Sequence, residues 1–171
     1  MERITLTADV QRIKVLVLDD ETAFLDLCRE FLGRDGGLDA DYVTSPRKAL
    51  EMMATVEYQA VVSDHELPGM DGMQFLRALR SMNMHIPFIM ITGHGQERLA
   101  IEALQNGADF YMEKAGSPAS MFEQLLRTLK AVTCLKRKAS ECLQDPFRVY
   151  SEVGVLLVSN GGERVMAASA R

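Results

Sequence analysis

Residues 61–72 read VVSDHELPGMDG, a stretch in which an apolar run meets an acid and then a loop. The β-branched pair Val61 and Val62 favours a strand, whereas the Pro-Gly pair further on marks a turn. Asp64 stands between them, at a point where an unpaired buried carboxylate would be costly. The acid therefore either marks where the chain meets water or carries a charge with a function.

Short apolar runs on both sides of this stretch alternate with helical patterns. The runs that predict strands are residues 13–18, 38–43, 60–63, 86–91 and 109–114. Regular β-α alternation with short connections favours a parallel sheet with helices on both faces. We therefore predict a doubly wound, flavodoxin-like α/β fold whose five strands take the order 2-1-3-4-5.

The overall composition is that of an ordinary globular protein. The chain has 171 residues, of which 47% are hydrophobic and 25% charged. Its net charge of −5 argues against a nucleic-acid-binding surface, and no apolar run approaches the roughly 20 residues that span a bilayer. The N-terminus lacks the build of a signal peptide, and the three cysteines have no CxxC spacing. We expect a cytoplasmic protein with reduced thiols that binds neither nucleic acid nor membranes.

Polar residues stand where four of the predicted strands end, and parallel strands bring those ends to one edge of the sheet. They are Asp19, Asp20, Asp64, Thr92 and Lys114. Clustered carboxylates need a cation, and oxygen ligands suit Mg²⁺. A carboxylate beside Mg²⁺ can attack phosphorus, while a hydroxyl and an ammonium contact the phosphoryl oxygens. Each residue alone fits an ordinary solvated strand end, but their combination favours phosphoryl chemistry.

This combination resembles the receiver domains of two-component response regulators, the CheY-like superfamily, over residues 12–130. The segments that carry the resemblance are VLVLDDE, SDHELPGMDG, IMITGHG and GADFYMEK. The resemblance implies that Asp64 accepts a phosphoryl group from a sensor histidine kinase, a phosphotransfer protein or a small phosphodonor. It also implies Mg²⁺ as the cofactor, with ligands from Asp19 (through water), Asp20, Asp64 and the main-chain carbonyl of Glu66.

The resemblance implies further roles around the phosphoacceptor. Thr92 and Lys114 would contact the phosphoryl group, and Tyr111 would be a switch aromatic that follows Thr92, although a partly buried surface aromatic fits Tyr111 equally well. The residues expected to tune access to the phosphoryl group or its lifetime are Glu66, Gly93 and His94.

One residue departs from the family pattern. Ala115 follows Lys114, where the family usually has a proline joined by a cis peptide bond. A cis bond before a residue other than proline costs roughly 2.5–4 kcal/mol. Either that strained bond is present, or the loop after Lys114 is rearranged.

The remainder of the chain divides into a helical extension at 131–145 and a β-hairpin-like tail at 146–171. An a/d-like pattern in the last helix is imperfect, and a helix packed on its own sheet explains its first half. The tail resembles the opening strands of a PAS sensory domain, which suggests a longer receiver–PAS chain. Because an isolated hairpin is marginal in water, we expect it to contact the receiver, a second copy in a homodimer, or a further domain.

The leading functional hypothesis is a phosphorylation-controlled signalling switch that changes a binding surface. Such a protein catalyses only its own phosphorylation and autodephosphorylation. One alternative is a degenerate receiver that acts only as an interaction module. Another is a haloacid-dehalogenase-like phosphatase, but that reading needs an acidic pair after the lysine, and residues 115–130 offer only Glu123.

Overall fold

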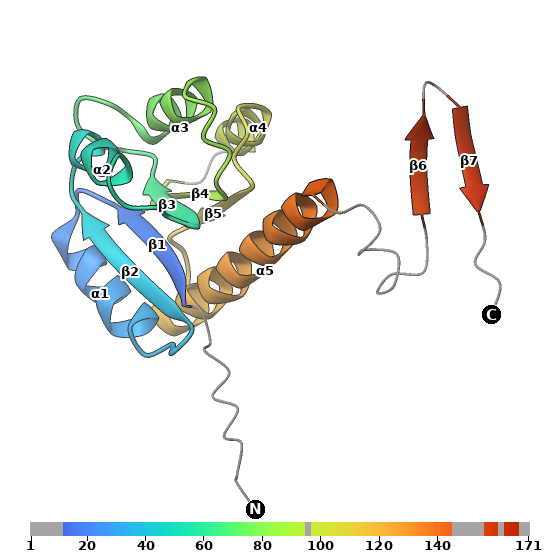
Figure 1. Ribbon diagram of the computed structural model, residues 1–171. Helices are drawn as coiled ribbons and strands as arrows, with labels where there is room; N and C mark the ends of the chain where they lie inside the picture. Colours follow the sequence, from blue (N-terminus) through green and yellow to red (C-terminus); the bar gives the residue numbers. More distant parts are fainter. Residues whose placement is uncertain (1–11, 95–96, 145–155, 161–162, 168–171) are drawn as a thin grey trace, which may run out of the picture. The chain divides into compact units, whose positions relative to one another are not determined.

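The computed structural model describes residues 12–94, 97–144, 156–160 and 163–167 (Figure 1). Strands and helices alternate along the first part of the chain. The strands are β1 (Ile13–Leu18), β2 (Leu38–Val43), β3 (Ala60–Asp64), β4 (Phe88–Thr92) and β5 (Phe110–Glu113). The helices are α1 (Thr22–Leu32), α2 (Pro46–Met53), α3 (Gly72–Ser81), α4 (Glu97–Gln105) and α5 (Pro118–Gln144).

The strands form one parallel sheet in the order β2-β1-β3-β4-β5, which confirms the predicted doubly wound topology. Several strand ends differ by one or two residues from the prediction, and β5 is one residue shorter at each end than the predicted 109–114. β4 begins at Phe88 rather than at residue 86, and the intervening Pro87 has no N–H to give to the sheet. β3 runs one residue further than expected and includes Asp64.

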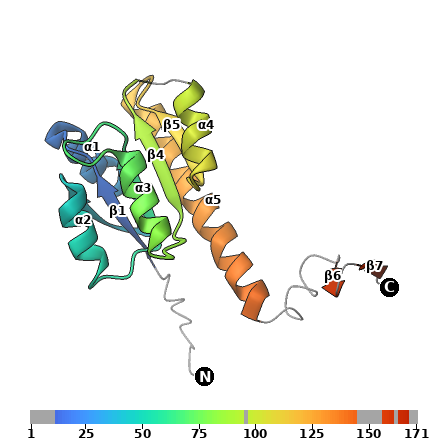
Figure 2. The same cartoon turned by 90° about the horizontal axis from the view of Figure 1, so that it is seen from above.

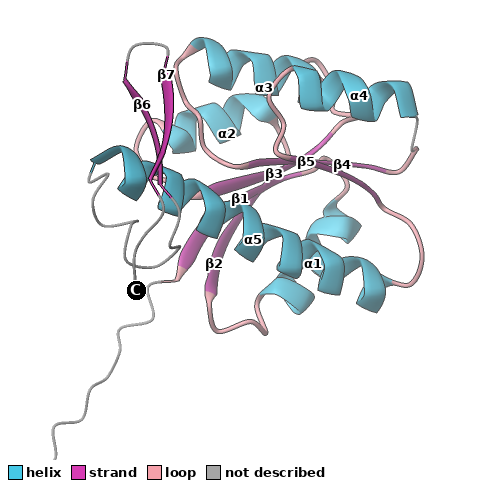
Figure 3. Cartoon of the chain, turned by 90° about the vertical axis from the view of Figure 1, so that its right-hand side faces the viewer, coloured by secondary structure: helices cyan, strands magenta, loops and turns pink. Residues whose placement is uncertain are grey.

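Helices cover both faces of the sheet (Figure 3). α1 and the part of α5 before residue 134 lie on one face, and α3 lies between α2 and α4 along the other (Figure 2). Side chains alternate along each strand, so β1 sends Val15 and Val17 to the first core and Leu16 and Leu18 to the second. This double burial explains why β1 is a nearly continuous apolar run.

An aromatic stack joins α1 to α5. The ring of Phe122 lies 4.7 Å from that of Phe31 and 5.8 Å from that of Phe24, centroid to centroid, with interplanar angles of 8° and 23°. The a/d-like residues of α5 are buried in the same core, as expected for a helix packed on its own sheet; they are Phe122, Leu125, Leu129 and Val132. This half of α5 is therefore not available as a coiled-coil seam.

Arg80, near the end of α3, ties together several main-chain segments. Its guanidinium donates to the carbonyl oxygens of Met84 at 2.6 Å, Ile86 at 3.1 Å and Gly107 at 2.7 Å. Asp109 lies 3.6 Å away as an ion-pair partner, and its carboxylate accepts from the main-chain N–H of Phe88. Arg80 thus holds the start of β4 against the turn that follows α4.

The edge strand β2 carries two acids whose partners lie on β1 and in the segment before β3. Lys14 of β1 lies 3.0 Å from a carboxylate oxygen of Asp39 and 3.1 Å from one of Asp41. The hydroxyl of Tyr58 donates to Asp41 at 2.7 Å. Burial and this hydrogen bond raise the pKa of Tyr58 above its usual value.

One ion pair joins α5 to the turn before β2, and the stability that it contributes depends on pH. Lys130 Nζ donates to Asp35 at 2.6 Å and lowers the pKa of that carboxyl below 3.8. The stabilisation is therefore present above pH 3.8 and is lost as the pH falls through the lowered value. Because Lys130 is half exposed, we expect Lys130→Met to lose only roughly 0.5 kcal/mol of unfolding free energy at neutral pH.

Urea unfolding of the wild type and Lys130→Met at neutral pH and at about pH 2.5 checks this expectation. The difference between the two proteins should become smaller at the acid pH, because the stabilisation is lost as the pH falls through the lowered pKa of Asp35. A difference that persists undiminished there would mean that the aliphatic stem of Lys130, rather than its charge, stabilises the contact.

The chain divides into two units, residues 1–133 and 134–171. In the second unit, β6 (Leu156–Asn160) and β7 (Glu163–Ala167) pair antiparallel. The predicted Gly-Gly turn and residues 145–155 lie outside the described residues, and the PAS resemblance stays a prediction. Among the helices that are described, none is both long and apolar enough to cross a bilayer.

Candidate functional site

The buried polar side chains of the described chain gather at the carboxyl ends of the strands. They are Asp19, Ser63, Asp64 and Thr92. Asp19 directly follows β1, Asp64 ends β3 and Thr92 ends β4, so the parallel topology brings them to one edge. Asp64 is only 3% exposed. The structure therefore places three of the predicted site residues together and buries each of them.

Lys114, which follows β5, joins the two buried acids. Its Nζ lies 2.7 Å from Asp19 Oδ2 and 2.9 Å from Asp64 Oδ1, with Glu21 further out at 3.9 Å. The other carboxylate oxygens accept main-chain hydrogen bonds: Asp19 from the N–H of Glu21 at 2.9 Å, and Asp64 from the N–H of Glu66 at 2.7 Å. Each acid is thus held on one side by the main chain and on the other by the lysine.

In this cluster, burial and the neighbouring charges shift the pKa values of Asp19 and Lys114 in opposite directions. Burial raises the pKa of Asp19, and the contact with Lys114 only partly reverses that effect. Burial alone would lower the pKa of Lys114, but its contacts with Asp19 and Asp64 outweigh burial and raise it. One ammonium facing two carboxylates leaves an excess of negative charge, which favours binding of a further cation.

The remaining predicted residues surround this cluster. The hydroxyl of Thr92 accepts from the main-chain N–H of His94 at 3.2 Å, and the N–H of Lys114 donates to the carbonyl of Thr92 at 2.7 Å. Tyr111 is half-buried and packs against the core on the α2–α3–α4 face. Thr92 and Lys114 are therefore linked through the main chain, and Tyr111 lies on a neighbouring strand.

Two exposed side chains form a pair beside the segment that follows Asp64. Glu66 Oε1 and His94 Nδ1 lie 3.3 Å apart, and both side chains are largely exposed. Gly93 is exposed as well, and a β-carbon there would meet no atom within 4 Å. The loops after β3 and β4 thus contact each other through their side chains.

The loop after Lys114 is rearranged rather than strained. The described residues contain no cis peptide bond, so Lys114 and Ala115 are joined in trans. Gly116 has a φ of 82°, a left-handed value that glycine adopts readily. This turn still leaves Lys114 in contact with both acids.

The donor atoms present suit Mg²⁺, although Lys114 takes the place between them. Asp19 Oδ2 and Asp64 Oδ1 are buried and, within the described residues, contact only the lysine ammonium. Mg²⁺ binds one or two such carboxylates and keeps several waters. Asp20 is exposed, and the described part of the chain holds no group of three or more His, Cys, Asp or Glu side chains arranged to bind a metal.

Sequence reasoning missed two residues of the site. Phe24 of α1 lies under the lysine, with its ring centroid 4.4 Å from Lys114 Nζ. A side chain at Gly72 would run into the main-chain carbonyl oxygen of Asp64, and the N–H of Gly72 donates to the carbonyl of His65 at 2.9 Å. Helical spacing in a sequence indicates only that Phe24 is buried, and a glycine at position 72 does not show what its missing side chain would have met.

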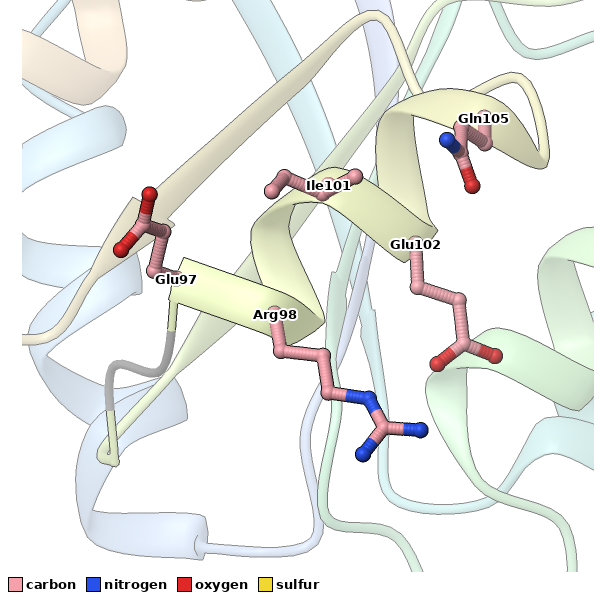
Figure 4. A pocket seen from close by; sticks show the side chains of 5 residues that line it. All are labelled: Glu97, Arg98, Ile101, Glu102 and Gln105. Carbon is pink, nitrogen blue, oxygen red and sulfur yellow. The ribbon is translucent and has the colours of Figure 1, made fainter.

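A surface pocket of about 440 Å³ lies apart from the acids. All of its lining residues come from α4 (Figure 4): Glu97, Arg98, Ile101, Glu102 and Gln105. It contains no residue of the cluster at the strand ends.

Comparison with known proteins agrees with this geometry. Residues 15–126, which reach from β1 into α5, match the family model described as the response regulator receiver domain. The chain belongs to this receiver family. The five-stranded parallel sheet with helices on both faces is accordingly the flavodoxin-like receiver fold.

Curated relatives of this receiver are regulators of greater length. The chain is 32% identical over 114 residues to the response regulator protein FleR of Pseudomonas aeruginosa, a match that covers 67% of this chain and 24% of FleR. It is 31% identical over 100 residues to the transcriptional regulatory protein FixJ of Bradyrhizobium diazoefficiens, covering 58% and 48%. The chain therefore spans between about a quarter and a half of the length of these relatives.

Solved receiver domains resemble the described sheet and helices. The receiver domain of the Francisella response regulator 1452 superposes with a TM-score of 0.61 at 27% identity, covering 70% of this chain and 98% of that one. A response regulator receiver domain from Clostridium thermocellum gives 0.60 at 27% identity, covering 71% and 98%. Nearly all of each solved domain matches this chain.

Proposed function

We propose that the protein is a phosphorylation-controlled signalling switch in which Asp64 accepts the phosphoryl group. The observation that supports this most directly is the bridge by which Lys114 contacts both Asp19 and Asp64 at the buried strand ends. The ammonium of a lysine that contacts two acids can exchange one of these contacts for an oxygen of an incoming phosphoryl group without leaving the site. Ordinary surface acids do not provide this arrangement.

In the proposed reaction, a carboxylate oxygen of Asp64 attacks phosphorus. The new O–P bond forms as the donor's P–N bond breaks, and the bonding electron pair leaves with the imidazole of a phosphohistidine, which takes up a proton from solvent. Lys114 pairs with one phosphoryl oxygen, and the hydroxyl of Thr92 donates to another. Transfer and autodephosphorylation are the only reactions that we assign to the protein.

Mg²⁺ would be held by Asp19, Asp20, Asp64 and the main-chain carbonyl of Glu66. When bound, it supplies positive charge to the transferring phosphoryl group. Since Lys114 now contacts the inner oxygens of both buried acids, binding of the ion requires the lysine to give up part of these contacts.

The side chains around the mouth of the site would tune the reaction. Glu66 and His94, which pair with one another, flank the path by which a donor or a hydrolytic water reaches Asp64. Gly93 leaves that path open. Tyr111 would change its rotamer as Thr92 moves and so carry the signal to the α4–β5–α5 face.

The phosphoryl donor would be a sensor histidine kinase or a phosphotransfer protein. The output partner would bind the α4–β5–α5 face, where Ile101 and Leu104 are exposed apolar residues of α4. A further domain of a longer chain and a second copy of this chain are both candidate partners. We expect this signalling to take place in the cytoplasm.

The experiment that tests the proposal is labelling with acetyl phosphate, followed by intact mass. We expect wild-type protein to gain one phosphoryl group with Mg²⁺ present and essentially none after chelation, because the excess negative charge at the acids repels an anionic donor. Adding Mg²⁺ back after chelation is the control and should restore labelling. Equal labelling without the ion would contradict the metal assignment, and no labelling under either condition would favour the degenerate receiver.

A further inference from the structure

Phe24 offers the flat face of its ring to the ammonium at the centre of the site. The ring belongs to α1, is 7% exposed, and has its centroid 4.4 Å from Lys114 Nζ. On other sides the same ammonium contacts Asp19 and Asp64. Lys114 is thus enclosed by two carboxylates and one aromatic face. A cation is attracted to such a face by the ring quadrupole, more strongly where water is excluded.

The ring of Phe24 is itself packed against other aromatic rings. Phe122 of α5 stacks on it at 5.8 Å, and Phe31 stacks on Phe122 at 4.7 Å. All three rings belong to the core between α1, α5 and the sheet. A side chain packed in this way cannot move aside when Lys114 changes partners, so it presents a rigid surface to the ammonium.

The main chain that follows Lys114 is exposed and does little to hold the lysine side chain in place. Ala115 and Gly116 are both exposed, and a β-carbon at Gly116 would meet no atom within 4 Å. The position of the ammonium therefore depends on side-chain contacts. Its ion pairs must change during phosphoryl transfer, because an Asp64 oxygen becomes bonded to phosphorus. The contact with Phe24 involves no reacting atom and can persist throughout.

We propose that Phe24 is a positioning residue for phosphoryl transfer, whose aromatic face holds the Lys114 ammonium at the strand ends in reach of the incoming phosphoryl group. This role rests on the proposed function of Asp64. Without the ring, the ammonium would be free to turn toward solvent and Glu21, which lies 3.9 Å away.

The test compares Phe24→Leu with Phe31→Leu in the whole chain. Both variants shorten the same aromatic stack, but only Phe24 touches Lys114. We expect Phe24→Leu to slow phosphorylation by acetyl phosphate and Mg²⁺ roughly three- to tenfold, the range of a partly desolvated cation–π contact. Phe31→Leu should keep the wild-type rate. Both proteins are checked for folding by urea unfolding.

Two further measurements separate positioning from packing. Trifluorophenylalanine at position 24 keeps the shape of the ring but weakens its negative face, so it should slow the reaction, whereas the same substitution at position 31 should not. In NMR spectra without Mg²⁺ or donor, the ε-methylene protons of Lys114 should carry a ring-current shift that disappears in Phe24→Leu. Combined with Lys114→Met, the Phe24→Leu change should have no additional effect on the rate.

The outcomes distinguish this inference from the proposed function. Wild type that gains no phosphoryl group would overturn both. If wild type is labelled and Phe24→Leu reacts as fast as Phe31→Leu, Phe24 has no positioning role and the function of Asp64 stands. Equal slowing by Phe24→Leu in the wild-type and Lys114→Met backgrounds would also overturn the inference.

Discussion

Replacing Asp64 with asparagine is expected to abolish phosphorylation, with at least a 100-fold loss of labelling by acetyl phosphate as an order-of-magnitude estimate. The amide has nearly the shape of the carboxylate but cannot act as the nucleophile. Lys114 and Asp19 keep their contact at 2.7 Å, so the surrounding cluster should stay in place. Intact mass after incubation with the donor and Mg²⁺ gives the result directly, since one phosphoryl group is gained or it is not.

Asp71→Asn is the matched control for this substitution. Asp71 lies on the same segment and caps α3, and asparagine is an equally good N-cap, so the helix should start as before. We expect Asp71→Asn to be labelled like the wild type. Equal labelling of Asp64→Asn would remove Asp64 from its proposed role and direct attention to Asp19, whose replacement by asparagine would then be the next experiment.

The largest loss of stability is expected for Arg80→Met. The side chain of Arg80 is only 15% exposed and satisfies the carbonyl oxygens of Met84, Ile86 and Gly107. Methionine fills a similar volume but leaves these acceptors without their donor and removes the charge of Arg80 beside Asp109. We expect a loss of about 2–4 kcal/mol in the free energy of unfolding.

Arg77→Met provides the comparison, because Arg77 lies one turn earlier on α3 and also reaches across to α4. Its guanidinium donates to Glu102 and Asn106, each at 2.8 Å, but its side chain is 51% exposed. Water can replace both partners, so the expected loss is below about 1 kcal/mol. Urea unfolding followed by circular dichroism measures both variants. Equal losses would show that burial does not decide the strength of these contacts.

The fold and the central acids could be predicted because they depend on periodic signals. Apolar runs alternating with helical patterns determine a doubly wound sheet, and that topology places the residues after each strand at one edge. Asp19, Asp64, Thr92 and Lys114 follow from this rule without any knowledge of side-chain packing. The structure places all four at the expected edge, and the first three are buried.

The contacts that complete the site could not be predicted in the same way. Periodicity says that Phe24 faces a core, but not that the side chain of Lys114, ninety residues later, lies over its ring. The close approach of Gly72 to the Asp64 carbonyl depends on the path of the loop over residues 65–71. Whether Ala115 is preceded by a cis or a trans bond depends on the whole loop, which local propensity does not determine.

The acids of β2 also affect whether the sheet of one copy of the protein can pair with a strand of another copy. β2 is an edge strand, so one side of its main chain is unpaired within the five-stranded sheet and could accept a strand from another molecule. A strand added there would take Asp39 and Asp41 away from water and press its own side chains against fixed negative charge. Such charges on a sheet edge discourage the pairing of one sheet with another.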